Sequence, residues 1–187
     1  MEKSLQGKRV AMLLTDGVEQ AEYEGPRAFL EEHGARVDLV SPKKPGERIQ
    51  AFNHLTPGAQ FPVDKAVSEA RPEEYDALVL PGGVANPDQL RLSPESVGFV
   101  SRYAQTGRPL AAICHGPWLL INAGLMSGRH VTSWPSLETD IRNAGGRWSD
   151  EPVVIDGRFI TSRKPEDIPA FNARLEDALR EPTAVGV

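Results

Sequence analysis

The feature that most constrains this chain is an apolar run that ends in a cysteine at a sharp turn. Residues 110–113 (Leu-Ala-Ala-Ile) are apolar on both faces, which is typical of a buried parallel strand. Gly116 and Pro117 then open an apolar helical stretch, and proline is tolerated in a first helical turn. Cys114 therefore lies where a strand ends and a helix begins, as in a nucleophile elbow, although Ala112 replaces the first glycine of that motif.

This position favours a reactive cysteine. A sharp turn pushes the side chain out of the sheet, and a helix N-terminus favours the thiolate, so we expect a lowered pKa for Cys114. The alternative is a buried structural cysteine, which is the commoner fate of a lone cysteine in the cytosol. The turn, rather than the cysteine itself, favours the nucleophile.

The hydrophobic pattern predicts an α/β fold in a single domain spanning residues 1–187. A strand, a helix and a second strand follow one another within residues 9–41, which implies a parallel sheet with a right-handed crossover. Asp156-Gly157 between two short apolar segments predicts a hairpin, with strands at 153–155 and 159–161. The remaining expected strands lie at residues 9–14, 36–41 and 76–80, with weaker ones at 49–52 and 61–63, and the expected helices lie at 20–32, 94–105, 117–122, 137–143 and 166–180.

Composition excludes several classes of protein. The formal net charge of −5 argues against a scaffold that binds nucleic acid non-specifically, because phosphate requires a basic surface. The single Cys rules out an intramolecular disulfide and a cysteine-cluster metal site. The N-terminal residues lack the apolar region of a signal peptide, and no apolar run approaches membrane-spanning length, so we expect no membrane contact and a cytoplasmic location.

Polar residues follow three of the predicted strands. In open α/β sheets, sites form at the carboxyl ends of the strands. The loops at residues 15–22, 81–92 and 114–117 leave such ends, so we expect their polar side chains to converge on one crevice.

Three motifs taken together resemble the ThiJ/PfpI family. They are Ile113-Cys114-His115-Gly116-Pro117, Leu80-Pro81-Gly82-Gly83 and Thr132-Ser133-Trp134-Pro135. That family belongs to the class I glutamine amidotransferase-like superfamily, so the resemblance implies a flavodoxin-like three-layer α/β/α sandwich with a mostly parallel sheet. The chain is most similar to the PfpI branch, whose members are described as intracellular proteases, general stress proteins and deglycases.

The resemblance assigns a role to Glu22. In the family, a glutamate that contacts the nucleophilic cysteine stands four residues before a proline in the first helix. Glu22 and Pro26 have that spacing, so the assignment goes to Glu22 rather than to Glu19. Its implied role is that of a protonated carboxyl that donates a hydrogen bond, or of a general acid/base. The residues alone favour a solvated carboxylate at a helix start.

The resemblance also makes His115 the catalytic histidine, which would deprotonate Cys114 and stabilise the thiolate. The alternative is a histidine that only shapes the turn.

In the PfpI branch an acidic residue from the neighbouring subunit orients this histidine. The Pro87-Asp88 pair makes Asp88 the candidate for that residue. This assignment implies at least a homodimer. An aspartate that caps a short helix is the alternative. The other histidines are poorer candidates by position: His33, His54 and His130.

Backbone groups complete the expected site. The N–H groups of Gly83 and His115 are the candidate oxyanion donors, because two donors must point to where negative charge develops. Gly82-Gly83 is not a phosphate loop, since no Gly-Lys-Ser/Thr follows. Trp134 is expected at the pocket rim, with packing in the core as the alternative. No cofactor and no metal are expected.

The residues indicate a cysteine-dependent hydrolase, and the resemblance to the PfpI branch implies a stress-related enzyme that acts on small glycated molecules, glycated protein or peptides. The alternative is a redox sensor or chaperone whose Cys114 is oxidised; the lack of a second cysteine to resolve a sulfenate weighs mildly against it. A glutaminase is rejected because no histidine follows His130.

Overall fold

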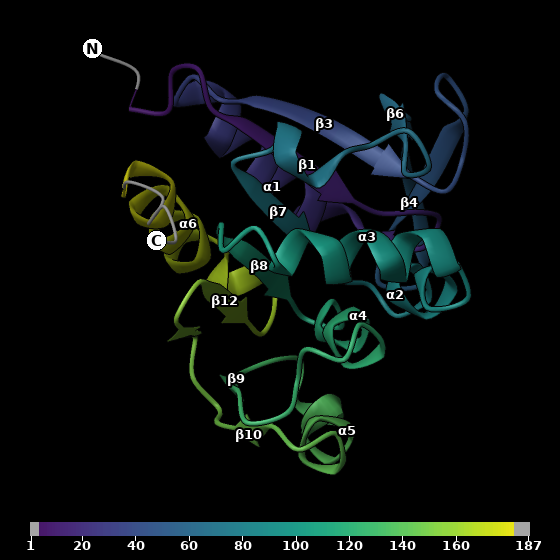
Figure 1. The fold of residues 1–187 in the computed structure, drawn as a ribbon. Coiled ribbons are helices and arrows are strands. Elements are labelled where there is room, and N and C mark those ends of the chain that lie inside the picture. Colours follow the sequence, from purple (N-terminus) through teal and green to yellow (C-terminus); the bar gives the residue numbers. More distant parts are fainter. Residues whose placement is uncertain (1–3, 182–187) are drawn as a thin grey trace.

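The computed structural model describes residues 4–181. It is built on one seven-stranded sheet, which runs through the middle of the molecule (Figure 1). The strand order is β11-β12-β8-β7-β1-β3-β6, and every pair of neighbours is parallel except β11 and β12. These strands are β1 (Arg9–Leu13), β3 (Arg36–Ser41), β6 (Lys65–Ala66), β7 (Ala77–Leu80), β8 (Leu110–Ile113), β11 (Val153–Asp156) and β12 (Phe159–Ser162). The mostly parallel sheet confirms the α/β prediction.

Helices cover both faces of the sheet (Figure 1). One face packs against α1 (Gln20–Glu32) and α6 (Ile168–Arg180), which also contact each other. The other face packs against α3 (Pro94–Ala104) and α4 (Pro117–Asn122), with α2 (Ala85–Leu90) beside α4. This is the three-layer α/β/α sandwich of flavodoxin-like folds.

Alternate residues of the strands feed two separate cores. In β1, Val10 and Met12 join the cluster that contains α1 and α6, whereas Ala11 and Leu13 join the cluster that contains α3 and α4. Side chains of a strand point to opposite faces, so a strand covered on both faces must be apolar throughout. The continuous apolar runs in the sequence are therefore the direct signature of this sheet.

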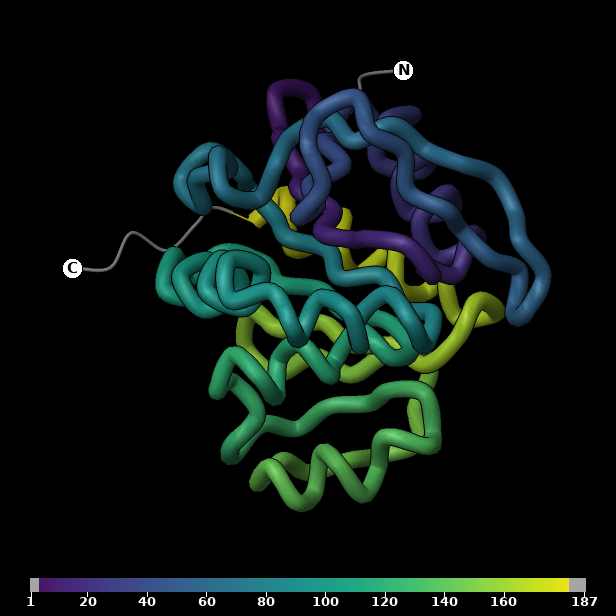
Figure 2. Tube along the Cα trace, turned by 90° about the vertical axis from the view of Figure 1, so that its right-hand side faces the viewer, coloured from purple at the N-terminus to yellow at the C-terminus, as the bar shows by residue number. Residues whose placement is uncertain are grey.

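Two smaller sheets extend the sandwich. β2 (Val18–Glu19) pairs with β4 (Arg48–Asn53), which pairs with β5 (Thr56–Pro62), and this hairpin projects beyond the main sheet. β9 (His130–Val131) pairs with β10 (Arg147–Trp148) near α5 (Glu138–Asn143). In the turned view, this green segment lies at the end opposite the purple N-terminal strand (Figure 2).

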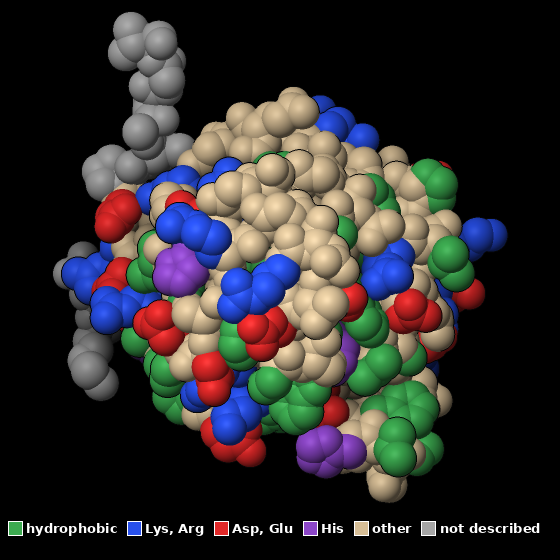
Figure 3. Space-filling view, turned by 90° about the horizontal axis from the view of Figure 1, so that it is seen from below, with side chains coloured by type: hydrophobic (Ala, Val, Ile, Leu, Met, Phe, Trp, Pro, Cys, Tyr) green, Lys and Arg blue, Asp and Glu red, His purple; other side chains and the backbone are tan. Residues whose placement is uncertain are grey.

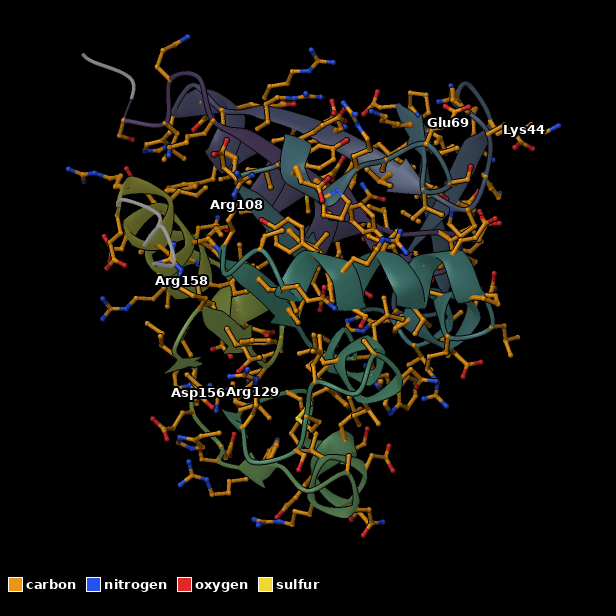
Figure 4. All side chains as sticks on the ribbon, viewed as in Figure 1. Lys44, Glu69, Arg108, Arg129, Asp156 and Arg158 are labelled. Carbon is orange, nitrogen blue, oxygen red and sulfur yellow. The ribbon has the colours of Figure 1, made fainter. Side chains whose placement is uncertain are left out.

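A cation–aromatic contact ties β9 to the β11–β12 hairpin. The guanidinium of Arg129 lies 3.7 Å from the ring centroid of Phe159 and 4.0 Å from the Asp156 carboxylate. Arg129 and Asp156 lie next to each other at this end of the molecule (Figure 4). The same carboxylate accepts the backbone N–H of His130 at 2.8 Å, so the hairpin aspartate anchors the start of β9.

Most predicted elements are confirmed, with small shifts at their ends. Ser93 caps α3, because its Oγ accepts the N–H of Ser96 at 3.1 Å. The last two helices begin later than predicted, since a 3-10 turn precedes each of them, at Pro135–Leu137 and Pro165–Asp167. Proline at the first position of each turn favours the tighter start. The weakly patterned hairpin forms longer strands than the sequence indicated.

Candidate active site

Cys114 occupies a strained turn directly after β8. Its φ of +61° lies in the left-handed region, which costs a residue with a side chain on the order of 1 kcal/mol or more. Two backbone hydrogen bonds hold it there: its N–H donates to Ser162 at 3.1 Å, and its carbonyl accepts from Trp134 at 2.9 Å. The turn requires glycine at position 116, because a Cβ there would collide with the Leu80 carbonyl. The turn has the geometry of a nucleophile elbow.

Glu22 lies beneath the sulfur, fully buried on α1. Its Oε2 accepts the backbone N–H of Gly82 at 2.8 Å. Its other oxygen, Oε1, is buried without a nitrogen or oxygen partner among residues 4–181, and the side chain with which the carboxyl interacts is Cys114. Burial raises the pKa of Glu22 to about 8, so this carboxyl keeps its proton at neutral pH and has a hydrogen to donate.

Gly82 lets Glu22 and Cys114 approach each other. A Cβ on Gly82 would lie 2.5 Å from Glu22 Oε2 and 2.7 Å from Cys114 Cβ. Both distances are far below van der Waals contact, so only glycine fits between the carboxyl and the cysteine. The sequence predicted a role for Gly83 but not this role for Gly82.

The sulfur has three further neighbours that can donate or accept a hydrogen bond. Cys114 Sγ lies 3.2 Å from His115 Nδ1, and the backbone N–H groups of Gly83 and His115 stabilise negative charge on the sulfur. Burial lowers the pKa of His115 to about 4, so the imidazole is neutral at pH 7 and carries one ring nitrogen without a proton. The structure therefore brings together the predicted nucleophile, base and backbone donors.

Burial changes the expectation for the thiol. Cys114 is 6% exposed, and this burial, together with any negative charge on Glu22, raises the pKa of its thiol, whereas a helix N-terminus alone predicts a lower value. Glu22 and Cys114 behave as one pair that shares a proton. The thiolate would accept from Gly83, His115 and protonated Glu22, whereas a Glu22 carboxylate would accept from Gly82 and the weakly donating thiol. A lowered thiol pKa thus depends on Glu22 retaining the proton.

Asn86 organises the loop after β7. This fully buried side chain accepts the N–H of Thr15 at 2.7 Å and donates to the carbonyls of Pro81 and Gly82 at 3.1 and 3.0 Å. It thereby ties the loop after β1 to the loop after β7. Sequence reasoning missed Asn86, and a polar residue three positions after a Gly-Gly turn was the only signal available.

The sulfur opens into a cleft of about 610 Å³. Glu22, Cys114 and His115 form its floor, and Trp134 forms part of its rim, 37% exposed and stacked 6.1 Å from the His115 ring. The structure thus places Trp134 at the pocket rather than in the core. The cleft is also lined by two residues that the sequence analysis set aside, Glu19 and His54.

Asp88 does not reach this cleft within its own chain. It is exposed on α2 and lines a second, shallower hollow of about 460 Å³ with Arg91, Trp118 and Asp140. α2 begins without a side-chain cap, so the capping alternative for Asp88 is wrong. The Trp118 ring lies between this hollow and the site, 5.1 Å from the His115 ring.

Other potential sites are less well formed. His33 Nδ1 pairs with the Phe29 carbonyl, and His130 Nε2 pairs with Ser149, away from Cys114. Within residues 4–181, no three His, Cys, Asp or Glu side chains are grouped so that they could hold a metal ion. No helix in that part of the chain is long and apolar enough to cross a bilayer.

Comparisons with known proteins agree with this geometry. Residues 8–177 match the sequence profile of the DJ-1/PfpI family. The chain is 38% identical to protein/nucleic acid deglycase 2 of Escherichia coli over 92% of its own length and 96% of the relative's, and 36% identical to the putative cysteine protease YraA of Bacillus subtilis over 92% and 99%. The crystal structure of Drosophila melanogaster DJ-1beta superposes with a TM-score of 0.83 at 26% identity, covering 92% of this chain and 90% of the other.

Proposed function

Because the chain belongs to the DJ-1/PfpI family, we propose that it is a stress-related hydrolase whose nucleophile is Cys114. Relatives that match almost end to end carry the names deglycase and putative cysteine protease. One observation carries the proposal: a thiol, a neutral imidazole, a protonated carboxyl and two backbone N–H groups meet at the floor of one cleft.

Each of these groups has a role in the proposed chemistry. His115 Nδ1 accepts the thiol proton, and Cys114 Sγ bonds to the electrophilic carbon of an early glycation adduct or a peptide carbonyl. The carbonyl oxygen becomes an oxyanion, which the N–H groups of Gly83 and His115 stabilise. Glu22 donates a hydrogen bond from its protonated carboxyl to the Cys114 thiolate.

In a peptide the oxyanion collapses, the C–N bond breaks, the imidazolium gives its proton to the leaving amine, and water hydrolyses the thioester. In a glyoxal or methylglyoxal adduct the sulfur displaces the amine from the carbinolamine carbon, so that the C–N bond breaks with the same proton transfer. The resulting hemithioacetal isomerises by a proton shift between its two oxygen-bearing carbons to a thioester, which water hydrolyses.

We favour the removal of glyoxal and methylglyoxal adducts, with peptide hydrolysis as the second activity. Both need the same nucleophile, and the cleft volume of about 610 Å³ accommodates a single adduct-bearing side chain. The nucleophile acts only when reduced, so we place the activity in a reducing compartment such as the cytoplasm.

The test is a substrate panel on wild type and Cys114→Ala. The panel holds a glycated amino acid, a glycated nucleotide, free methylglyoxal and an unfolded peptide, and circular dichroism confirms that the variant is folded. We expect turnover to vanish in the variant. Turnover that survives the substitution would overturn the proposal, and suppression of aggregation by both proteins without turnover would favour a chaperone.

We further propose that the protein acts as a homodimer in which Asp88 of one subunit orients His115 of the other. Asp88 is exposed and carries no side-chain hydrogen bond among the described residues, and its hollow reaches Trp118, which contacts His115. Cys114→Ala and Asp88→Ala proteins, each inactive alone, should regain activity when their subunits exchange. Native mass spectrometry must show that mixed dimers form; mixed dimers without activity would contradict the arrangement.

A further inference from the structure

Among the described residues, the side chains that line the cleft include acidic residues but no Lys or Arg. The lining contains Glu19, Glu22 and two histidines. Elsewhere the surface differs: on the face seen from below, basic and acidic side chains are interspersed (Figure 3). Because Glu22 keeps its proton at neutral pH, a phosphate-bearing ligand that enters this cleft meets the Glu19 carboxylate and finds no cationic partner in the described lining.

Glu19 is the carboxylate exposed to an incoming ligand. It lies at the end of β2, half-buried, and its Oε2 accepts the backbone N–H of His54 at 3.1 Å. Its Oε1 has no hydrogen-bond partner within residues 4–181. The hairpin thus fixes the side chain and leaves one oxygen free at the cleft.

Cations near the cleft are already paired. Lys43 contacts Asp16 at 2.7 Å, and Arg163 contacts Asp150 and Asp167, each at 2.8 Å. Pro165, which lines the cleft, is flanked by Lys164 and Glu166, whose charges are opposite. Among the described residues, none of these cations forms an ion pair with Glu19, so its negative charge is unbalanced.

The rim of the cleft is apolar and exposed. Leu55 is 94% exposed at the hairpin tip and Val84 is 58% exposed beside Gly83, facing the same opening as Trp134. Long cationic side chains lay their methylene stems along apolar surface while the charged end stays near a carboxylate. A glycated arginine side chain fits both features. Its methylene stem can lie along the apolar rim, and its guanidinium, which keeps its positive charge, can approach the Glu19 carboxylate.

We propose that Glu19 is a specificity-determining residue, which selects adducts on arginine side chains of peptides over adducts on phosphate-bearing nucleotides. This rests on the proposed function for the type of reaction, but its charge component can be tested without turnover. The chain has one cysteine, so any thiol reagent reports on this cleft alone.

The first experiment compares two methanethiosulfonates, one carrying an ethylammonium and the other an ethylsulfonate group. Rates at Cys114 are divided by the rates with N-acetylcysteine amide. We expect the cationic reagent to be favoured, and Glu19→Gln to reduce that preference about fivefold at low salt. Glu69→Gln removes the same charge from an exposed position near β6 that does not line the cleft (Figure 4), and it should leave the preference unchanged. Equal rates for the two reagents, or an unchanged ratio in Glu19→Gln, would overturn the proposal.

The second experiment measures turnover of methylglyoxal-treated acetyl-arginine amide, guanosine and GTP. Guanosine and GTP differ only in phosphate, so their kcat/KM ratio isolates the charge. We expect kcat/KM to decrease in the order arginine adduct, guanosine adduct, GTP adduct. In Glu19→Gln, the ratio of kcat/KM for guanosine to kcat/KM for GTP should move closer to one. Cysteine-dependent turnover with GTP equal to guanosine would refute the specificity while sparing the proposed function. Absence of turnover on all three would refute the deglycase, and the thiosulfonate ratio would still decide the role of Glu19.

Discussion

At the floor of the cleft, Glu22 and Cys114 pack around Gly82 with no space for one added carbon, whereas the rim at Leu55 and Val84 is open to solvent. The floor joins α1 to the ends of β7 and β8, so the packing of the whole sandwich determines its geometry. The rim comes from a projecting hairpin and a loop. The same cleft therefore combines rigid chemistry with a surface that can change without disturbing the fold.

The largest expected effect is that of Gly82→Ala, which forces an atom between the carboxyl and the cysteine. We expect kcat/KM to fall about 100-fold or more, because displacement of a reacting group by about 1 Å costs that much. Unfolding should be easier by about 1–3 kcal/mol through overpacking.

Gly98→Ala is the matched control. Gly98 lies within α3, and its added Cβ would meet only the end of the Arg102 side chain, at 3.2 Å. Activity should be unchanged and stability equal or slightly higher, since alanine favours helices. Equal kinetic losses in the two variants would show that the floor is less closely packed than the structure indicates.

The next effect concerns the pH dependence of stability. The pKa of Glu22 is raised to about 8 in the folded protein from about 4.5, so the folded state holds a proton that the unfolded state releases. The contribution of Glu22 to stability should therefore fall between pH 4.5 and pH 8, by an amount on the order of a few kcal/mol. The lowered pKa of His115 acts in the opposite direction up to about pH 6.5, and it does so in wild type and variant alike. Glu22→Gln removes this dependence, so its stability relative to wild type should rise across that window in urea titrations. A pH-independent difference would mean that Glu22 is ionised when folded.

The smallest effect is expected at the rim. Leu55→Ala removes an exposed apolar side chain, so KM for a glycated arginine substrate should rise about two- to fivefold with little change in kcat. The melting temperature should stay within about 1 °C, because a side chain that is 94% exposed contributes little to the core. A large change in melting temperature or in kcat would remove the distinction between rim and floor.

The sequence predicted the sheet because strands covered on both faces must be apolar throughout, and this signal is strong in β1, β7 and β8. It predicted the position of Cys114 because the turn motif is local. It did not predict that Gly82 separates two side chains, or that Asn86 joins two loops, because those contacts connect residues 60 or more positions apart.

The hairpin was the weakest part of the prediction. β5 is mostly exposed, so it lacks the alternating apolar pattern that marks a half-buried strand. His54 and Glu19 reach the cleft only through the pairing of β2 with β4, which no local pattern reveals. The resemblance to the family selected Glu22, and burial then explained why this carboxyl differs from Glu19.

The central claim is that Glu22 keeps its proton and thereby allows Cys114 to carry the negative charge. The rate of iodoacetamide alkylation against pH, followed by mass in wild type, Glu22→Gln and Glu22→Leu, tests it most directly. We predict a Glu22→Gln midpoint close to that of the wild type, because an amide also donates, and a Glu22→Leu midpoint well above both, because burial raises the pKa of the thiol and leucine offers no donor to offset it. Identical midpoints in wild type and Glu22→Leu, or a Glu22→Gln midpoint as high as that of Glu22→Leu, would contradict the claim.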